Sequence, residues 1–276
     1  MSEGMTIRFG IAEEWTHFGE HHQLFLDRFP NLRAAMHAAF LREVRASEPV
    51  DRVVFFTGRL CVEEFMEIVL LCGNGYGIAA LKIVRGMFER VITALYLRLH
   101  PEDTDDFLDF HWVSQRKLAR AIESSFGKEV LEGKLEEVEA NYQRVRGRFM
   151  VTDCKRCGTQ RLNFTWSKLD LVAMARNVGT IGALIVPAYY LPTREAHSTV
   201  GAILSRLKEN SDGVLTFDEG PQREKADEAL ISAHNLLLNV LELQREHFKL
   251  QALKEPLGRC YEDFLDIWGR PKKREK

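Results

Sequence analysis

The sequence predicts an all-α protein, a multi-helix bundle with one small inserted β-hairpin. Apolar residues recur at intervals of three and four along most of the 276-residue chain, as they do on a buried helix face. The alternation of apolar and polar residues that is typical of strands occurs only within residues 148–166. No glycine-rich loop follows a strand candidate, so a Rossmann or P-loop nucleotide-binding fold is not supported.

Proline, glycine and capping residues set most of the predicted helix limits. Pro30 separates the first two helices, and Gly73-Asn74-Gly75 separates the next two. Thr104 can cap a fifth helix, Ser167 forms a capping-box-like pair with Asp170, and Pro221 fits the first turn of a long helix. The predicted helices cover residues 13–29, 32–44, 53–72 and 76–99, and further helices begin near residues 104, 128, 167, 221 and 256.

Length and composition favour a single helical domain over residues 1–276, ending in a short basic tail at 270–276 that we expect to be disordered. The net charge of -2 gives no global signature of nucleic-acid binding. Charged residues interrupt the most apolar stretch, 65–99, so we expect no membrane span. Five cysteines cannot form a complete disulfide framework, and the start of the chain lacks an apolar segment of signal-peptide length. We therefore expect a cytoplasmic protein with reduced thiols.

The hairpin within residues 148–166 carries a Cys-x-x-Cys-Gly motif at Cys154, Cys157 and Gly158. Two thiolates at this spacing can bind one tetrahedral metal ion, and the glycine permits a tight turn, as in half of a zinc ribbon. The missing ligands could be histidines of the same chain or the same cysteine pair of a second subunit, which would make a homodimer. The alternatives are a redox pair and two free cysteines in a loop.

Basic residues crowd the same region, against the single acidic residue Asp153 between positions 141 and 168. Phosphate oxygens of a nucleic acid would suit this patch over residues 144–168, with Phe164 and Trp166 as stacking surfaces. The alternative is a solvated face whose charge is balanced by the acidic run 129–139, and we favour it. The basic residues are Arg144, Arg146, Arg148, Lys155, Arg156, Arg161 and Lys168.

The predicted helix over residues 76–99 carries an unusual polar stripe on an otherwise apolar surface. The stripe contains Lys82, Arg85, Glu89, Thr93, Tyr96 and His100. Arg85 and Glu89 lie one turn apart, so we predict that they are paired and substantially buried. The pair is either an internal ion pair or the lining of a pocket, and a plain solvent-facing stripe is the alternative.

A second polar constellation is Tyr189-x3-Thr193-x3-His197. In one continuous helix these three side chains share a face, whereas Pro192 suggests that a new helix begins there. His197 could reach a polar site in either case. The alternative is a histidine whose hydrogen bonds serve only the fold.

These segments resemble a bacterial, all-helical domain-of-unknown-function family (number 5677). The resemblance rests on Arg85-Gly-Met-Phe-Glu89, on Tyr96-Leu-Arg-Leu-His100-Pro101-Glu102, on Trp166 and on the segment from Tyr189 to His197, and spans residues from about 55 to 240. It implies a helical fold with an arginine–glutamate helix and a late Tyr…Thr…His segment, and it brings no established activity.

Two functions follow from these residues. The first is a binding or interaction module whose hairpin is a metal-stabilised knuckle, with zinc as the expected metal. The alternative is an enzyme or toxin-like protein that acts on RNA or another phosphate-containing substrate, with Arg85 as anion ligand and Glu89 or His197 as acid or base. HEPN-type helical nucleases are an analogy only, because no arginine here is followed by a histidine with four to six residues between them; Arg33 and His37 have three residues between them. Ligand-binding candidates are Tyr96, His100, Trp166, Tyr189 and Thr193.

Overall fold

A computed structural model describes residues 12–44, 47–131, 133–154, 156–197, 199–218 and 220–269. These residues are mainly helical, with two small antiparallel hairpins, which confirms the all-α prediction. The predicted tail at 270–276 and Lys155 of the basic patch lie outside the described residues. Among the residues described, none of the helices combines the length and apolar character that a membrane crossing requires.

The chain divides into two compact units, one formed by residues 1–98 with 175–276 and the other by residues 99–174. The division falls where the long helix of the polar stripe ends and where the chain returns after the cysteine hairpin. The prediction of one domain over residues 1–276 stays a prediction, because compactness does not measure whether two units unfold together.

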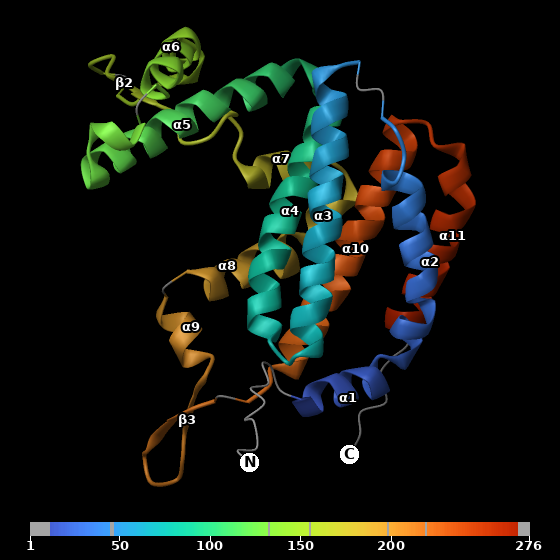
Figure 1. The fold of residues 1–276 in the computed structure, drawn as a ribbon. Helices are drawn as coiled ribbons and strands as arrows, with labels where there is room; N and C mark the ends of the chain where they lie inside the picture. The colour runs from blue at the N-terminus through green and yellow to red at the C-terminus, as the bar shows by residue number, and fades with distance from the viewer. Residues whose placement is uncertain are drawn as a thin grey trace, which may run out of the picture. The chain divides into compact units, whose positions relative to one another are not determined.

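Six helices form the frame of the larger unit (Figure 1): α1 (Ala12–His21), α2 (Gln23–Phe40), α3 (Pro49–Gly73), α4 (Gly77–Leu99), α10 (Arg223–His247) and α11 (Lys254–Trp268). Helix α10 packs along α3, and α11 packs along α2. Their apolar faces bury Phe25, Phe65, Phe88 and Leu237 almost completely. At Gly77 a Cβ atom would collide with the backbone of Ala226, so this glycine lets α4 begin directly against α10.

Helix α2 runs through Pro30 without a break, so the predicted boundary there is wrong. The chain instead turns at His22, between α1 and α2. Proline costs roughly 3 kcal/mol inside a helix. Buried residues on both sides of Pro30, Phe25 before it and Leu32 and Met36 after it, hold the helix against its neighbours and offset that cost.

The larger unit also contains a chain of short elements between α7 (Leu171–Asn177) and α10. A 3₁₀ turn (Thr180–Leu184), a π turn (Val186–Tyr190), α8 (Leu191–Ala196) and α9 (Val200–Leu204) lead into strands β3 (Leu207–Glu209) and β4 (Leu215–Phe217). The predicted start of α7 at Ser167 is wrong, because Asp170 is the cap and its Oδ1 accepts from the Ala173 amide at 2.7 Å.

The hairpin formed by β3 and β4 was not predicted. Leu207 pairs with Phe217 and Glu209 with Leu215 in antiparallel register. The turn is built by Asn210, whose Oδ1 accepts from the amides of Asp212 and Val214, and by Gly213 at φ 76. Asparagine and glycine in a turn are a hairpin signal, but strands of three residues, Leu-Lys-Glu and Leu-Thr-Phe, are too short to show the alternation.

The smaller unit consists of α5 (Thr104–Phe126), α6 (Leu135–Val145) and strands β1 (Met150–Thr152) and β2 (Gln160–Leu162), with 3₁₀ turns at Pro101–Asp103, Lys128–Leu131 and Arg146–Phe149. Met150 pairs with Leu162 and Thr152 with Gln160, which confirms the inserted hairpin and shortens both predicted strands. Val113, Tyr142, Val145 and Phe149 form its buried core.

Candidate functional site

Three polar side chains that are distant in the sequence meet on the larger unit. Arg85 Nε donates to Glu89 Oε1 at 3.1 Å, one turn along α4. Arg85 Nη1 lies 2.9 Å from His197 Nε2, which follows α8. An arginine can only donate, so His197 Nε2 is the acceptor in this contact. The structure therefore brings together all three residues predicted to carry chemistry.

The backbone around α8 places two of the predicted side chains against Arg85. The π turn Val186–Tyr190 leads directly into α8, and Pro192 lies in the first turn of that helix, where its missing N–H costs nothing. The Tyr189 ring lies under the guanidinium group, with its centroid 5.3 Å from Arg85 Cζ. His197 ends α8 in an extended conformation, which directs it away from the helix axis.

The Arg85–Glu89 pair forms as predicted, but it is not substantially buried. The side chains of Arg85 and Glu89 are 24% and 42% exposed, and His197 is exposed. Apolar residues dominate the rest of α4, yet the stripe opens to solvent at Lys82 and becomes buried only at Tyr96. The expectation of a desolvated ion pair is therefore wrong, and the cluster is accessible to a ligand.

The other candidate residues are placed differently. Thr193 donates its hydroxyl to the Tyr189 carbonyl oxygen, so it supports the turn that carries Tyr189. Tyr96 is 5% exposed and lies within the core. His100 and Trp166 belong to the unit of residues 99–174, where His100 Nδ1 is 3.4 Å from Glu102 Oε1 and Trp166 packs edge-on against Phe107 at 5.4 Å.

The Cys-x-x-Cys-Gly motif forms a tight knuckle between β1 and β2. The Asp153 amide donates to the Thr159 carbonyl oxygen at 2.8 Å, and the Gly158 amide donates to the Cys154 carbonyl oxygen at 2.9 Å. Gly158 has φ 70, a conformation that glycine adopts without strain. Hydrogen bonds from Thr159, and then from the Cys154 thiol, lower the pKa of the Cys157 thiol to about 7.

Metal binding at Cys154 and Cys157 stays a prediction. In the part of the chain that the structure describes, no cluster of three or more His, Cys, Asp or Glu side chains is arranged to hold a metal ion. Cys157 is exposed and Cys154 is partly exposed, and Cys157 Sγ lies 2.8 Å from Thr159 Oγ1. The two thiols together supply a dithiol ligand on an accessible turn.

Much of the predicted basic patch is neutralised inside the smaller unit. Arg148 pairs with Asp106 and Asp109 of α5, and Arg144 Nη2 lies 3.1 Å from Asp109 Oδ1. Burial tends to raise the pKa of Asp109, but the hydrogen bonds from these two arginines hold it below its ordinary value. Arg161 Nε lies 2.8 Å from Asp153. The acids that pair with these arginines are thus on α5 and in the knuckle, whereas the sequence suggested the run 129–139.

Sequence reasoning missed a buried carboxylate on α3. Glu64 forms an ion pair with Arg90 of α4, and its second oxygen is buried with no hydrogen-bond partner among the described residues. Burial raises the pKa of Glu64 to about 7, although Arg90 opposes this shift. Gly86 leaves the space through which Arg90 reaches it. No local spacing links residues 64 and 90, so only the packing of α3 on α4 reveals the pair.

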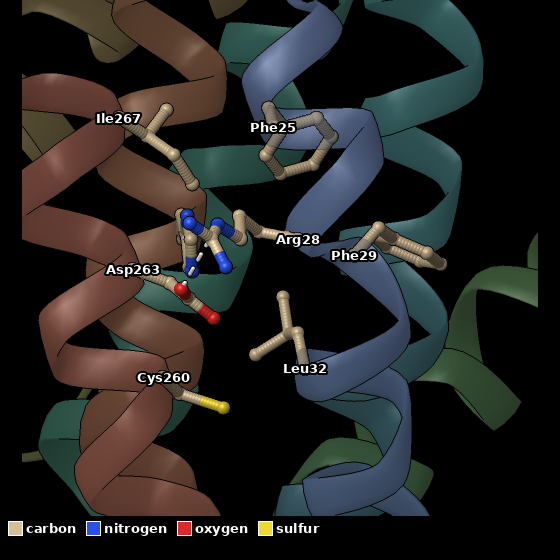
Figure 2. A pocket seen from close by; sticks show the side chains of 8 residues that line it. Phe25, Arg28, Phe29, Leu32, Cys260, Asp263 and Ile267 are labelled. Carbon is tan, nitrogen blue, oxygen red and sulfur yellow. Dashed lines mark ion pairs between the residues drawn. The ribbon is translucent and has the colours of Figure 1, made fainter.

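A small cavity lies between α2 and α11, and two of the residues that line it form an ion pair. Figure 2 shows Arg28 extending from α2 toward Asp263 of α11, where Nε and Oδ1 are 3.4 Å apart. Asn31 donates to the other Asp263 oxygen at 2.8 Å. His234 of α10 also lines the cavity and is 2% exposed. These contacts join α2 to α11, and we assign them to the fold.

Fold and cluster together define an all-α protein that gathers an arginine, a glutamate and a histidine on one exposed surface. The chain belongs to the family of unknown function DUF5677, whose model matches residues 51–214, more than half of the chain. This match confirms the resemblance drawn from the Arg85–Glu89 helix and the Tyr189–His197 segment, and it includes the cysteine knuckle. Searches among curated proteins and among solved structures found no match.

Proposed function

We propose that this protein is a binding module for a phosphate-containing ligand and that Arg85 and His197 form its anion site. The observation that supports the proposal most directly is the 2.9 Å contact between Arg85 and His197, which joins positions 112 residues apart. Arginine presents a planar fork of donors that suits phosphate oxygens, and histidine can add a hydrogen bond or a charge.

The guanidinium group of Arg85 is held in place by some of its contacts, and another of its contacts can be exchanged for a ligand. Glu89 accepts from Nε, and the Tyr189 ring lies under the plane. These two contacts fix the orientation of the fork. The Nη1 atom donates to His197, whose exposed ring can turn aside. A phosphate oxygen replaces Nε2 as the acceptor, and the freed imidazole then donates to the same phosphate.

The experiment measures binding of inorganic phosphate and of a short single-stranded RNA by calorimetry at low and moderate salt. Arg85→Gln and His197→Gln should each weaken RNA binding by roughly tenfold to a hundredfold, because a charge-assisted hydrogen bond is lost. Arg59→Gln is the matched control, because Arg59 and Glu63 form the same kind of exposed one-turn pair on α3 at 3.6 Å. Equal affinity in Arg85→Gln, Arg59→Gln and the wild type would refute the proposal.

A second candidate function is cleavage of RNA by an enzyme or toxin-like protein using the same residues. It is favoured by the position of His197 Nε2, which as an acceptor faces the arginine fork. In this reaction His197 takes the proton of a ribose 2′-hydroxyl, whose oxygen bonds to the phosphorus as the bond to the 5′-oxygen breaks. The leaving oxygen takes a proton from a water molecule, and the hydroxide that remains takes the proton held by His197. Arg85 binds the charged phosphoryl oxygens, and the products are a 2′,3′-cyclic phosphate and a 5′-hydroxyl.

Paired RNA and DNA oligonucleotides of one sequence test the catalytic candidate. RNA should be cut to a cyclic phosphate while DNA, which lacks the 2′-hydroxyl, stays intact. His197→Gln should lower the rate by at least a hundredfold, whereas Arg59→Gln should leave it unchanged. Binding of RNA without any cleavage by the wild type would retain the binding module and reject the enzyme.

Three further expectations stay predictions: a cytoplasmic location, a homodimer, and nucleic-acid binding at residues 144–168. The ion pairs of Arg144, Arg148 and Arg161 reduce the charge available to phosphate there. We therefore place the expected RNA contact at Arg85 and not in the basic patch. A variant in which Arg156 and Lys168 are replaced by Gln separates the two surfaces, because it should leave RNA affinity within about twofold of the wild type.

A further inference from the structure

The knuckle between β1 and β2 presents half of a metal site in an organised form. Backbone hydrogen bonds among Asp153, Cys154, Gly158 and Thr159 hold the described residues on both sides of the turn, which lowers the cost of ordering the two thiols around a metal. Cys154 and Cys157 are at the accessible end of the hairpin, beyond the last paired residues Thr152 and Gln160. Ligand preorganisation of this kind is what distinguishes a metal knuckle from two cysteines in a loose loop.

Tetrahedral zinc in a structural site takes four protein ligands, and the knuckle supplies two. A twofold axis through the metal brings the same two thiolates from a second copy, and this completes a Cys₄ site without any other residue type. We propose that Cys154 and Cys157 of two copies of this chain together bind one zinc ion. The ligand class is a thiophilic divalent cation, and the partner is a second copy of the chain.

The surface beside the knuckle suits such a pairing. Four thiolates around one zinc ion carry a net charge of about -2, which needs positive charge nearby. Arg156 lies between the two cysteines in the sequence and supplies one such charge, whereas Arg161 of β2 is paired with Asp153. Phe164 is 72% exposed, and the Arg161 guanidinium lies 4.5 Å from its ring centroid. This apolar ring next to a charged turn gives a second copy a surface to cover.

This inference goes beyond the proposed function, because the knuckle lies in residues 99–174 and uses none of Arg85, Glu89 and His197. Loss of zinc and loss of RNA binding are therefore separate outcomes. The test uses the full chain, purified without chelator under reducing conditions. Zinc is measured by elemental analysis, and molar mass is measured by light scattering before zinc removal, after it and after zinc is restored.

We expect about 0.5 equivalents of zinc per chain and a dimer that dissociates when zinc is removed and returns when it is added. Cys154→Ser and Cys157→Ser should each lower the zinc content at least tenfold and give a monomer, with unchanged helix content by circular dichroism. Gln160→Ser is the control, because it changes an exposed residue beside the turn and keeps both thiols.

Cobalt substitution gives an independent reading of the ligands. The cobalt-loaded dimer should show the visible absorption of a tetrahedral thiolate site, and each Cys→Ser variant should lose it. One equivalent of zinc on a monomer would place all ligands in one chain and overturn the bridge. Less than about 0.1 equivalents of zinc per chain would overturn metal binding altogether. A dimer that forms with equal affinity in the presence and absence of zinc would overturn the bridging role of the metal.

Discussion

The Arg85–Glu89 pair shows how solvent exposure determines the contribution of an ion pair to stability. The sequence placed both residues on an apolar helix, and a buried pair would cost several kcal/mol to break because the remaining charge is desolvated. With 24% and 42% of the two side chains exposed, water and salt screen the charges instead. Its value to the protein then lies in orienting the arginine and not in stabilising the fold.

The first prediction is a small stability effect at this pair. Arg85→Met and Glu89→Gln should each lower the free energy of unfolding by less than about 1 kcal/mol, with a coupling of about 0.5 kcal/mol in the double variant. Urea melts of the wild type and the three variants measure both quantities. Single losses of 3 kcal/mol or more, recovered in the double variant, would mean that the pair is desolvated in solution.

The second prediction concerns His234, where burial lowers the pKa to about 4. The unfolded chain takes up a proton near the ordinary histidine value of about 6.5, and the folded chain does so only near pH 4, so protons favour unfolding between these values. Stability associated with His234 is thus present above about pH 6.5 and is lost as pH falls toward 4. The loss approaches roughly 3 kcal/mol.

Chemical denaturation at pH 7 and pH 4.5 checks this behaviour. His234→Gln should lose clearly less stability than the wild type between these two pH values, because glutamine does not titrate. The change also removes the acceptor of the Trp268 indole N–H at 3.1 Å, so the comparison is the pH difference within each protein and not the absolute stability. Equal pH differences would contradict the buried neutral histidine.

At the scale of an element, helix α2 shows packing overriding a local break signal. Pro30 is exposed and its ring removes one backbone donor, yet the helix continues because Phe25, Leu32 and Met36 are buried on its inner face. Proline does disfavour a helix interior, so the signal itself was correct. It failed to predict a break because the tertiary contacts of the flanking turns stabilise the helix by more than the proline costs.

The third prediction follows from that cost. Pro30→Ala should raise the free energy of unfolding by about 1–3 kcal/mol, because the alanine amide can donate within the helix and the ring clash disappears. Thermal melts give the sign directly, and His37→Ala, an exposed change in the same helix, is the control. A destabilised Pro30→Ala would show that α2 depends on the bend that proline introduces.

At the scale of the whole molecule, the two compact units differ in the size of their buried cores. Residues 99–174 rely on the cluster of Val113, Tyr142, Val145 and Phe149, whereas the larger unit buries long faces of α3, α4 and α10. Regions with fewer buried apolar side chains open at lower free energy. We expect the smaller unit to open first.

The fourth prediction tests this with hydrogen exchange read by mass spectrometry. Phe149→Ala should destabilise the smaller unit by about 3–5 kcal/mol and speed exchange in α5 and α6, with little change in α3 and α10. Leu237→Ala is the matched change in the larger unit. If each variant speeds exchange equally in both units, the chain unfolds as the single domain that its length predicts.

The sequence by itself determined the helical class, the inserted knuckle hairpin and the pairing of Arg85 with Glu89, because each depends on residues within about one turn or one hairpin of each other. It also indicated His197 as a residue able to reach a polar site. It mistook the break at Pro30 and missed the hairpin of β3 and β4, where local signals were overridden or too short.

Only the tertiary structure decided that Arg85 meets His197, that Glu64 meets Arg90 and that Asp106 and Asp109 balance the basic patch. These contacts join residues 26 to 112 positions apart. The residues in each contact are not related by a helical or strand repeat, so no spacing in the sequence predicts these contacts. The exposure of Arg85 was decided in the same way, because it depends on which neighbouring elements cover α4 and not on the pattern of α4 itself.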